Sequence, residues 1–189
     1  VDNISDCYAL VEKLMILKSF AFDTETSSLN ALEAEIVGLS FSYKAREAYY
    51  VPTPTNPKER DEILAVFKPL FENERIEKVG QNIKFDYHIL ANYGIELKGR
   101  LFDTMIAHYL IQADMRHNMT VLAETYLNYS PIKIESILGK GKAQLNMRDM
   151  PAIKIKKYAC EDDDITWQLK AVFESLLKED DLISLFRKI

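Results

Sequence analysis

The first half of the chain alternates between short apolar runs and polar turns, which is typical of strands that build a sheet. The segment SFAFDTET predicts a buried strand from about residue 19 to 24. EIVGLSFSY and EAYYVPT predict two more strands, separated by a polar turn at residues 44–46. NPKERDEILAVFKPLFEN has helical spacing and predicts a helix that starts near Pro57, and IEKVG predicts a short strand that ends at Gly80.

The second half of the chain has mainly the apolar periodicity of helices. NIKFDYHILANYG predicts a helix capped by Asn82 at its front and by Gly94 at its back. After Gly99 the pattern is helical, and it ends in a long helix from about residue 150 to 178 with Pro151 in the first turn. Strands that precede helices, with a parallel pairing through the crossover, predict an α/β fold with a mixed sheet flanked by helices.

Length and composition favour one globular domain with its own core. The chain has 189 residues, 48% of them hydrophobic and 28% charged. No apolar run is long enough to span a bilayer, so no membrane partner is expected. Its two cysteines, Cys7 and Cys160, predict neither a disulfide framework nor a metal site, which fits a reducing cytoplasm.

The charge is unevenly distributed along the chain. The formal net charge is -5, yet residues 131–157 contain seven Lys and Arg residues and two acids, a local +5 that leaves -10 for the rest. The overall charge argues against a protein that coats nucleic acid by charge alone. The basic stretch could follow a phosphate backbone, and it could equally serve only solubility.

A pair of acids and an Asn–Asp pair stand where predicted strands end. Asp23 and Glu25 are two residues apart, so their side chains leave a strand on the same face. Asn82 and Asp86 are four apart and share a face of the next helix. Each pattern taken singly is also typical of a solvated strand end or of an acid placed near a helix amino terminus. In combination they indicate a site that holds a cation.

A third group of acids lies in YACEDDDITW, residues 158–167. Since a helix turns about 100° per residue, only Glu161 and Asp162 lie close to the face of Tyr158, whereas Asp163 and Asp164 point elsewhere. We interpret these remaining acids as solvated or as structural hydrogen-bond acceptors. Asp103 in LFDTM is interpreted as a helix N-cap.

The three patterns together, D-x-E, N-x-x-x-D and Y-x-x-x-D, resemble the three motifs of the DEDDy 3'-5' exonucleases. The chain is similar, in the order and the sequence of its motifs, to the proofreading exonuclease domain of bacterial family A DNA polymerases, DNA polymerase I. The segments that carry this similarity are FAFDTETSSL, VGQNIKFDYHIL, FDTMIAHYL, GKGKAQL and YACEDDDITWQL. The resemblance implies a ribonuclease H-like fold with a mixed five-stranded sheet. It also implies that Asp162, not Glu161, is the last acid of the site.

By this resemblance, Asp23, Glu25, Asp86 and Asp162 bind two divalent ions, Mg²⁺ or Mn²⁺, which prefer oxygen ligands. Asp23 is the natural bridge between the two ions, and four acids this close should raise at least one pKa when no metal is bound. Tyr158, with an ordinary pKa of about 10, is a poor base and is expected to orient the attacking water.

The resemblance also implies a set of substrate contacts. Leu29 and Ile134 are expected to pack against the terminal bases, although ordinary core packing explains these two equally well. Ile134 stands where relatives often carry an aromatic residue. The remaining expected contacts are Gln81, Asn82 and Phe85 along the path of the strand, and Thr24 and Thr26, the latter near the terminal nucleotide.

The sequence therefore predicts a metal-dependent 3'-5' exonuclease that hydrolyses the single-stranded 3' end of DNA and releases nucleoside 5'-monophosphates. Residues 1–189 are interpreted as one exonuclease domain of a longer DNA polymerase I chain, with a polymerase domain as its partner in that chain. A bacterial cytoplasmic location at the nucleoid follows from that interpretation. Two alternatives stay open: an RNA 3'-end exonuclease similar to ribonuclease D, and a catalytically silent domain that positions a polymerase.

Overall fold

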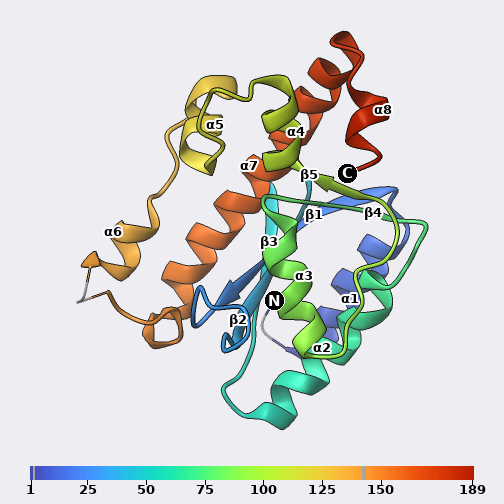
Figure 1. Ribbon diagram of the computed structural model, residues 1–189. Helices are drawn as coiled ribbons and strands as arrows, with labels where there is room; N and C mark the ends of the chain where they lie inside the picture. The colour runs from blue at the N-terminus through green and yellow to red at the C-terminus, as the bar shows by residue number, and fades with distance from the viewer. Residues whose placement is uncertain (2, 142–143) are drawn as a thin grey trace.

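A five-stranded mixed sheet forms the centre of the computed structural model, which describes residues 1, 3–141 and 144–189 (Figure 1). The order across the sheet is β3-β2-β1-β4-β5. β2 pairs antiparallel with both β1 and β3, whereas β1 pairs parallel with β4, and β4 with β5. The strands are β1 (Ser19–Thr26), β2 (Ile36–Lys44), β3 (Glu47–Pro52), β4 (Glu77–Gly80) and β5 (Leu101–Asp103). The predicted mixed sheet is confirmed.

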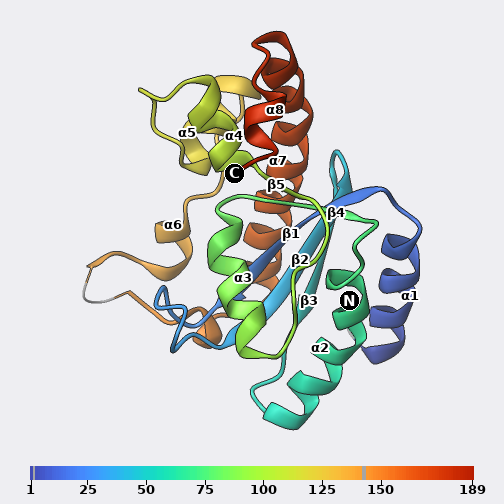
Figure 2. The same cartoon turned by 45° about the vertical axis from the view of Figure 1, so that its right-hand side comes forward.

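Helices cover both faces of the sheet (Figures 1 and 2). The helices are α1 (Ile4–Met15), α2 (Pro57–Phe71), α3 (Ile83–Asn92), α4 (Thr104–Ile111), α5 (Met119–Tyr126), α6 (Ile134–Leu138), the 3₁₀ turn η2 (Met147–Asp149), α7 (Ala152–Glu179) and α8 (Ile183–Phe186). α1, α2 and α3 share a core with Phe20 and Phe22, while α4, α5 and α7 share another with Ala21. The pleat of β1 therefore divides its side chains between two helical layers.

The long helix α7 lies across one face of the sheet (Figure 2). Its amino-terminal part buries Ile155 and Ala159 against Val37 and Tyr50 of β2 and β3. Its later turns bury Ile165, Leu169 and Phe173 in the core that contains Ala21, Val79 and Phe102. One helix thus spans from the antiparallel to the parallel part of the sheet.

The predicted Asn82 cap of α3 is wrong in its side-chain contact. Asn82 holds the N-cap position with a left-handed φ of 65°, and its side chain makes no capping hydrogen bond. The carboxylate of Asp103 accepts instead from the backbone N–H of Asn82 at 3.2 Å and of Ile83 at 2.8 Å. Asp103 also accepts from Met105 N at 2.8 Å and Ile106 N at 3.3 Å, which confirms its predicted N-cap role at α4. One buried acid therefore starts two helices.

Other boundaries differ from the pattern in small ways. Gly94 follows the end of α3 with φ 68°, as expected for a residue after a helix. Pro151 is the N-cap of α7 and does not lie within its first turn. The structure adds α1, β5, α6 and α8, which the apolar pattern did not predict as separate elements. Lys142 and Ala143 of the GKGKAQL motif lie outside the described residues.

In the described part of the chain, no helix combines the length and the apolar character that a membrane crossing requires.

Asp103→Ala should destabilise the fold by about 2 kcal/mol or more, because four backbone N–H groups from two helix starts lose their shared acceptor. Asn118→Ala is the matched control, since Asn118 caps only α5 through Val121 N and should cost about 1 kcal/mol. Urea unfolding of both variants measures the difference. Equal losses would contradict the double role of Asp103.

Candidate active site

Asp23 and Glu25 lie on the face of β1 that α7 covers. Ala21, Asp23 and Glu25 are two residues apart, so their side chains share one face of the strand. Ala21 packs in the core shared with α7. Asp23 pairs with Ser40 of β2, and Glu25 with Gly38. Glu25 is only 4% exposed. The strand pleat thus directs both carboxylates to the junction between the sheet and α7, as their spacing predicts.

Asp86 reaches the same region from the first turn of α3. Its Oδ1 accepts two hydrogen bonds from Thr24, one from the backbone N–H at 3.0 Å and one from the hydroxyl at 2.6 Å. Both Thr24 and Asp86 are buried. The residue between the two acids of β1 therefore fixes the third acid, a positioning role that the predicted substrate contact of Thr24 did not include.

Asp162 enters from α7 together with Tyr158, one helical turn earlier. Burial raises the pKa of Asp162, and a hydrogen bond from the Tyr158 hydroxyl opposes that rise without cancelling it. Burial and the negative charges of Asp162 and Glu25 raise the pKa of Tyr158 far above its ordinary value of 10. Tyr158 is therefore a neutral hydroxyl at physiological pH, suited to hydrogen bonding and unsuited to act as a base.

Burial is the main cause of the unusual pKa values of the four acids. It raises the pKa of Asp23 well above 3.8, and the charges of Asp86 and Glu25 raise it further. Burial together with Asp162 does the same to Glu25. The pKa values of Asp86 and Asp162 rise to about 7, again through burial, against the opposing hydrogen bonds. The expectation that the clustered acids raise at least one pKa is confirmed in direction.

The donor chemistry of this cluster fits a hard divalent cation. Among residues 1, 3–141 and 144–189, no Lys or Arg is one of the main groups that shift the pKa of Asp23, Glu25, Asp86 or Asp162. Within the described residues, the buried Oε1 of Glu25 has no hydrogen-bond partner. Carboxylate oxygens are the ligands that Mg²⁺ and Mn²⁺ prefer. In the same described residues no three His, Cys, Asp or Glu side chains form a preassembled metal cage, so the fit rests on chemistry and burial.

Asp163 departs from the expectation that it faces solvent. It is 1% exposed, and neither carboxylate oxygen has a hydrogen-bond partner among the described residues. Burial raises its pKa well above 3.8, as do Asp162 and Asp86, while nearby Ser40 opposes the shift. The spacing held a signal: Asp163 follows Ile155 and Ala159 at intervals of four, the spacing of the side of α7 that packs on the sheet. A fifth acid is therefore buried beside the four expected ones.

The other acids of this stretch have structural partners. Asp164 accepts from the backbone N–H of Arg46 at 2.5 Å and from the Gln168 amide at 3.0 Å, which confirms its predicted structural hydrogen bond. Glu161 accepts from the Tyr129 hydroxyl at 2.5 Å and from the backbone N–H of Ile132 at 2.6 Å. Glu161 thereby ties α7 to the segment that precedes α6.

The expected substrate contacts lie in different environments. Leu29 is 93% exposed, so core packing does not explain it. Ile134 is half-buried and packs on the cluster that contains Met147 and Ile155, as core packing predicts. Phe85 is half-buried against the core of α1, α2 and α3, and Asn82 is exposed. Only Leu29 presents a free apolar side chain.

Two further expected contacts have protein partners. The amide of Gln81 donates to the carbonyl of His117 at 2.7 Å and accepts a short hydrogen bond from the Thr104 hydroxyl. The Thr26 hydroxyl donates to the carbonyl of Ser28 at 3.0 Å. Gln81 therefore links the end of β4 to α4 and to the segment before α5, and its contact with substrate stays a prediction.

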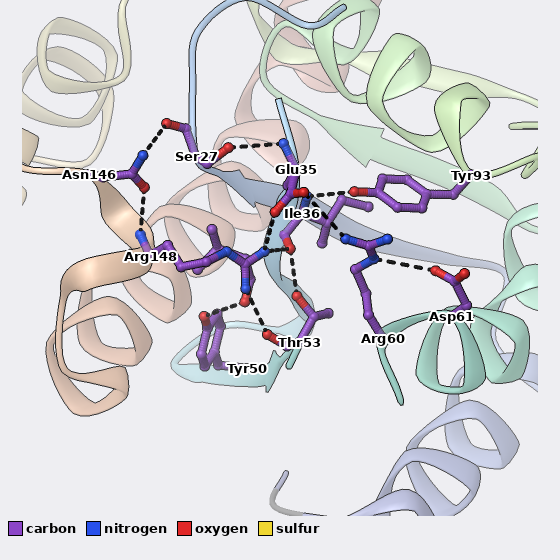
Figure 3. Close-up of polar contacts among 11 residues, drawn as sticks. Ser27, Glu35, Ile36, Tyr50, Thr53, Arg60, Asp61, Tyr93, Asn146 and Arg148 are labelled. Carbon is purple, nitrogen blue, oxygen red and sulfur yellow. Dashed lines mark hydrogen bonds and ion pairs between the residues drawn. The ribbon is translucent and has the colours of Figure 1, made fainter. Parts of the chain in front are cut away.

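The segment after Glu25, residues 27–35, carries Leu29 and is held at its base (Figure 3). Ser27 N donates to the carbonyl of Glu35 at 3.0 Å, and Glu35 N donates to the Ser27 hydroxyl at 3.0 Å. The Asn146 amide donates to the carbonyl of Ser27 at 3.0 Å. We call residues 27–35 the Leu29 loop. Its base is closed and attached to the segment that contains η2.

Sequence comparison relates the chain to known proteins. A family described as 3'-5' exonuclease matches residues 1–178. DNA polymerase I of Borreliella burgdorferi is 40% identical over 184 residues, which cover 95% of this chain and 20% of that protein. The chain thus spans about a fifth of the length of this curated relative.

Structure comparison supports the fold. The structure of Brucella melitensis NrnC with bound Mg²⁺ matches this chain with a TM-score of 0.75 at 22% identity. The matched region covers 99% of this chain and 84% of NrnC. Escherichia coli RNase D, an exoribonuclease involved in structured RNA processing, has a TM-score of 0.77 at 16% identity and covers 98% of this chain and 46% of RNase D. The mixed five-stranded sheet is the ribonuclease H-like fold of 3'-5' exonucleases, as the resemblance implies.

Asp163→Asn should stabilise the metal-free protein at pH 7.5 by roughly 1 to 3 kcal/mol, because it removes a carboxyl whose ionisation burial opposes. A raised folded pKa means that the folded state binds the proton more tightly, so wild-type stability falls as pH rises above about 3.8. The gain from Asp163→Asn should therefore be small near pH 4 and grow with pH.

Urea unfolding in chelator across this pH range measures the gain. Asp164→Asn is the matched control, since Asp164 has two hydrogen-bond partners and should gain nothing. A stability gain from Asp163→Asn that does not change with pH would contradict the argument.

Proposed function

The chain belongs to the 3'-5' exonuclease family found in DNA polymerase I, and from that we propose that it hydrolyses the 3'-terminal phosphodiester of DNA with the help of two divalent ions. The products are nucleoside 5'-monophosphates, and the biological role is the removal of mispaired nucleotides during replication and repair. The single-stranded 3' end is the proposed substrate, since its bases are already unstacked.

The observation that carries the proposal is that burial raises the pKa values of Asp23, Glu25, Asp86 and Asp162, while no Lys or Arg of the described residues is among the main groups that shift them. Buried carboxylates of this kind are costly unless a cation accompanies them. Three separate elements, β1, α3 and α7, supply them. An arrangement used only for stability would not gather so many acids from distant segments.

Each side chain has a proposed part in the reaction. Asp23, Glu25, Asp86 and Asp162 would hold Mg²⁺ or Mn²⁺, with Asp23 shared between the two sites. When bound, the ions supply a more acidic water and stabilise the charge on the leaving 3' oxygen. The Thr24 N–H and hydroxyl keep Asp86 in place. The neutral hydroxyl of Tyr158 would orient the attacking water by a hydrogen bond.

The proposed setting is one exonuclease domain, residues 1–189, within a longer polymerase chain. The relative from Borreliella burgdorferi is about five times as long as the region that this chain matches. A polymerase domain in the same parent chain would deliver the 3' end to the site. The bacterial cytoplasm at the nucleoid, where the chromosome lies, is the corresponding location.

An RNA substrate is the second candidate, because RNase D shares the fold at a TM-score of 0.77. The acids that we assign to hydrolysis act on the phosphodiester, which DNA and RNA share. Selection between the two requires contacts to the sugar, where only RNA carries a 2'-hydroxyl. Hydrolysis of DNA and RNA of the same sequence therefore distinguishes the two candidates.

Mononucleotide release from single-stranded DNA and RNA of the same sequence tests the proposal. With Mg²⁺ or Mn²⁺, the protein should release mononucleotides from the 3' end of DNA faster than from RNA, and chelator should abolish release. Asp162→Ala is the negative control, and Asp164→Ala on the same helix is the matched variant that should keep activity. Faster release from RNA would favour the second candidate, and no release with either ion would favour a silent domain.

Tyr158→Phe should lower kcat by roughly 10- to 100-fold, because it removes the hydroxyl that orients water and leaves all four carboxylates in place. Its affinity for Mn²⁺, measured by calorimetry, should stay close to that of the wild type. An unchanged kcat would rule out the proposed part of Tyr158. A large loss of Mn²⁺ affinity would assign the tyrosine to the metal site.

A further inference from the structure

Arg148, in the 3₁₀ turn η2, joins three segments of backbone through one guanidinium group (Figure 3). Nη1 donates to the carbonyl of Thr53 at 3.2 Å, just after β3, and Nη2 donates to the carbonyl of Ile36 at the start of β2. Nη2 also lies 3.7 Å from Oε2 of Glu35, the last residue of the Leu29 loop. The Arg148 side chain is 17% exposed. It is therefore a half-buried cross-link.

The contacts around this guanidinium extend in two directions. Glu35 also pairs with Arg60 of α2, with Oε1 at 3.8 Å from Nη1, so two arginines flank the carboxylate. Asn146 accepts from the Arg148 backbone N–H at 2.9 Å and donates through its amide to the Ser27 carbonyl at 3.0 Å. The turn before α7 thus holds both ends of the Leu29 loop, at Ser27 and at Glu35.

One of the segments that Arg148 holds carries a side chain expected at the terminal bases. Leu29 lies in the Leu29 loop and is 93% exposed. The position of Leu29 therefore depends on how η2 is attached to the base of this loop. The guanidinium suits this task, since its planar fork can serve two carbonyls and a carboxylate at once.

We propose that Arg148 is a positioning residue that sets where the Leu29 loop presents Leu29 to the terminal bases. This inference rests on the proposed exonuclease function. Arg148 acts through the base of the loop and not by touching the DNA, because its Nη groups are used by Thr53, Ile36 and Glu35. Loss of the cross-link should displace Leu29 and weaken its packing against the terminal bases, while the carboxylates and the chemistry stay unchanged.

The test compares two single-stranded DNA oligonucleotides, one intact and one whose last two nucleotides lack their bases. Arg148→Gln should raise KM for the intact strand by roughly 10-fold with kcat within about 2-fold of wild type, and should leave KM for the baseless strand within about 2-fold. Arg148→Lys keeps the charge but loses the fork, so its KM should lie between those of wild type and Arg148→Gln.

Salt dependence separates positioning from a direct phosphate contact. A lysine or arginine bound to a phosphate contributes to the salt dependence of binding, so its removal lowers the slope of log affinity against log salt by about one. The positioning role predicts an unchanged slope for Arg148→Gln. A lower slope would overturn the inference and assign Arg148 to the DNA backbone.

Asn146→Ala tests the same attachment of the Leu29 loop if Arg148→Gln fails to fold. Asn146 is exposed, and its loss removes only the attachment of Ser27 and the contact with the Arg148 N–H. It should raise KM for the intact strand alone, in the same sense as Arg148→Gln. Asn118→Ala, an exposed cap on α5, is the matched control and should change neither KM.

The outcomes distinguish this inference from the proposed function. A wild-type protein that releases no nucleotides with Mg²⁺ or Mn²⁺ overturns both. An active wild type whose Arg148 and Asn146 variants lose activity equally on both strands, or lose none, overturns the inference alone.

Discussion

The cost of burying carboxylates is the constraint on which the rest of this structure depends. Asp23, Glu25 and Asp86 lie at a junction where burial raises their pKa values, and within the part of the chain that the structure describes no Lys or Arg is among the main groups that shift them. Such an arrangement opposes folding, because a buried charge without a counter-charge is unfavourable. The surrounding sheet and helices must therefore provide enough stability to hold these acids. If the acids serve the proposed hydrolysis, function and stability compete at this point of the fold.

The fold meets this demand by attaching backbone from several segments to single side chains. Thr24 gives Asp86 two donors, Asp103 accepts four backbone N–H groups at the starts of α3 and α4, and Arg148 holds the carbonyls of Ile36 and Thr53. In each case one polar side chain joins elements that are distant in sequence. Buried hydrogen bonds of this kind are rigid, since breaking one leaves an unpaired polar group. Such rigidity is what a site built from three elements needs.

Much of the fold was predictable from apolar spacing. The strands β1 to β4, the helices α2 and α3 and the long helix α7 follow patterns that are visible in the sequence. The short elements β5 and α6 have three and five residues, too few for a period to be recognised. Asn82 illustrates a second limit. An asparagine before a helix is a sound cap in isolation, but Asp103, twenty-one residues later, supplies the acceptor, and no local pattern reveals that.

The sequence by itself determined which side chains are available for the proposed chemistry and how they are spaced. The D-x-E pair directs Asp23 and Glu25 to one face because a strand alternates, and Tyr158 with Asp162 lies on one side of α7 because a helix has a fixed rotation per residue. The interval of four from Ile155 and Ala159 indicates the packed side of α7, but only the tertiary structure decided that this side meets the strands as far as Asp163, which is 1% exposed. Helical rotation gives the angles between side chains of one helix, whereas the direction that faces the sheet is set by contacts with the strands. For the same reason Arg148 appeared as one more basic residue in the sequence and became a cross-link only in the folded chain.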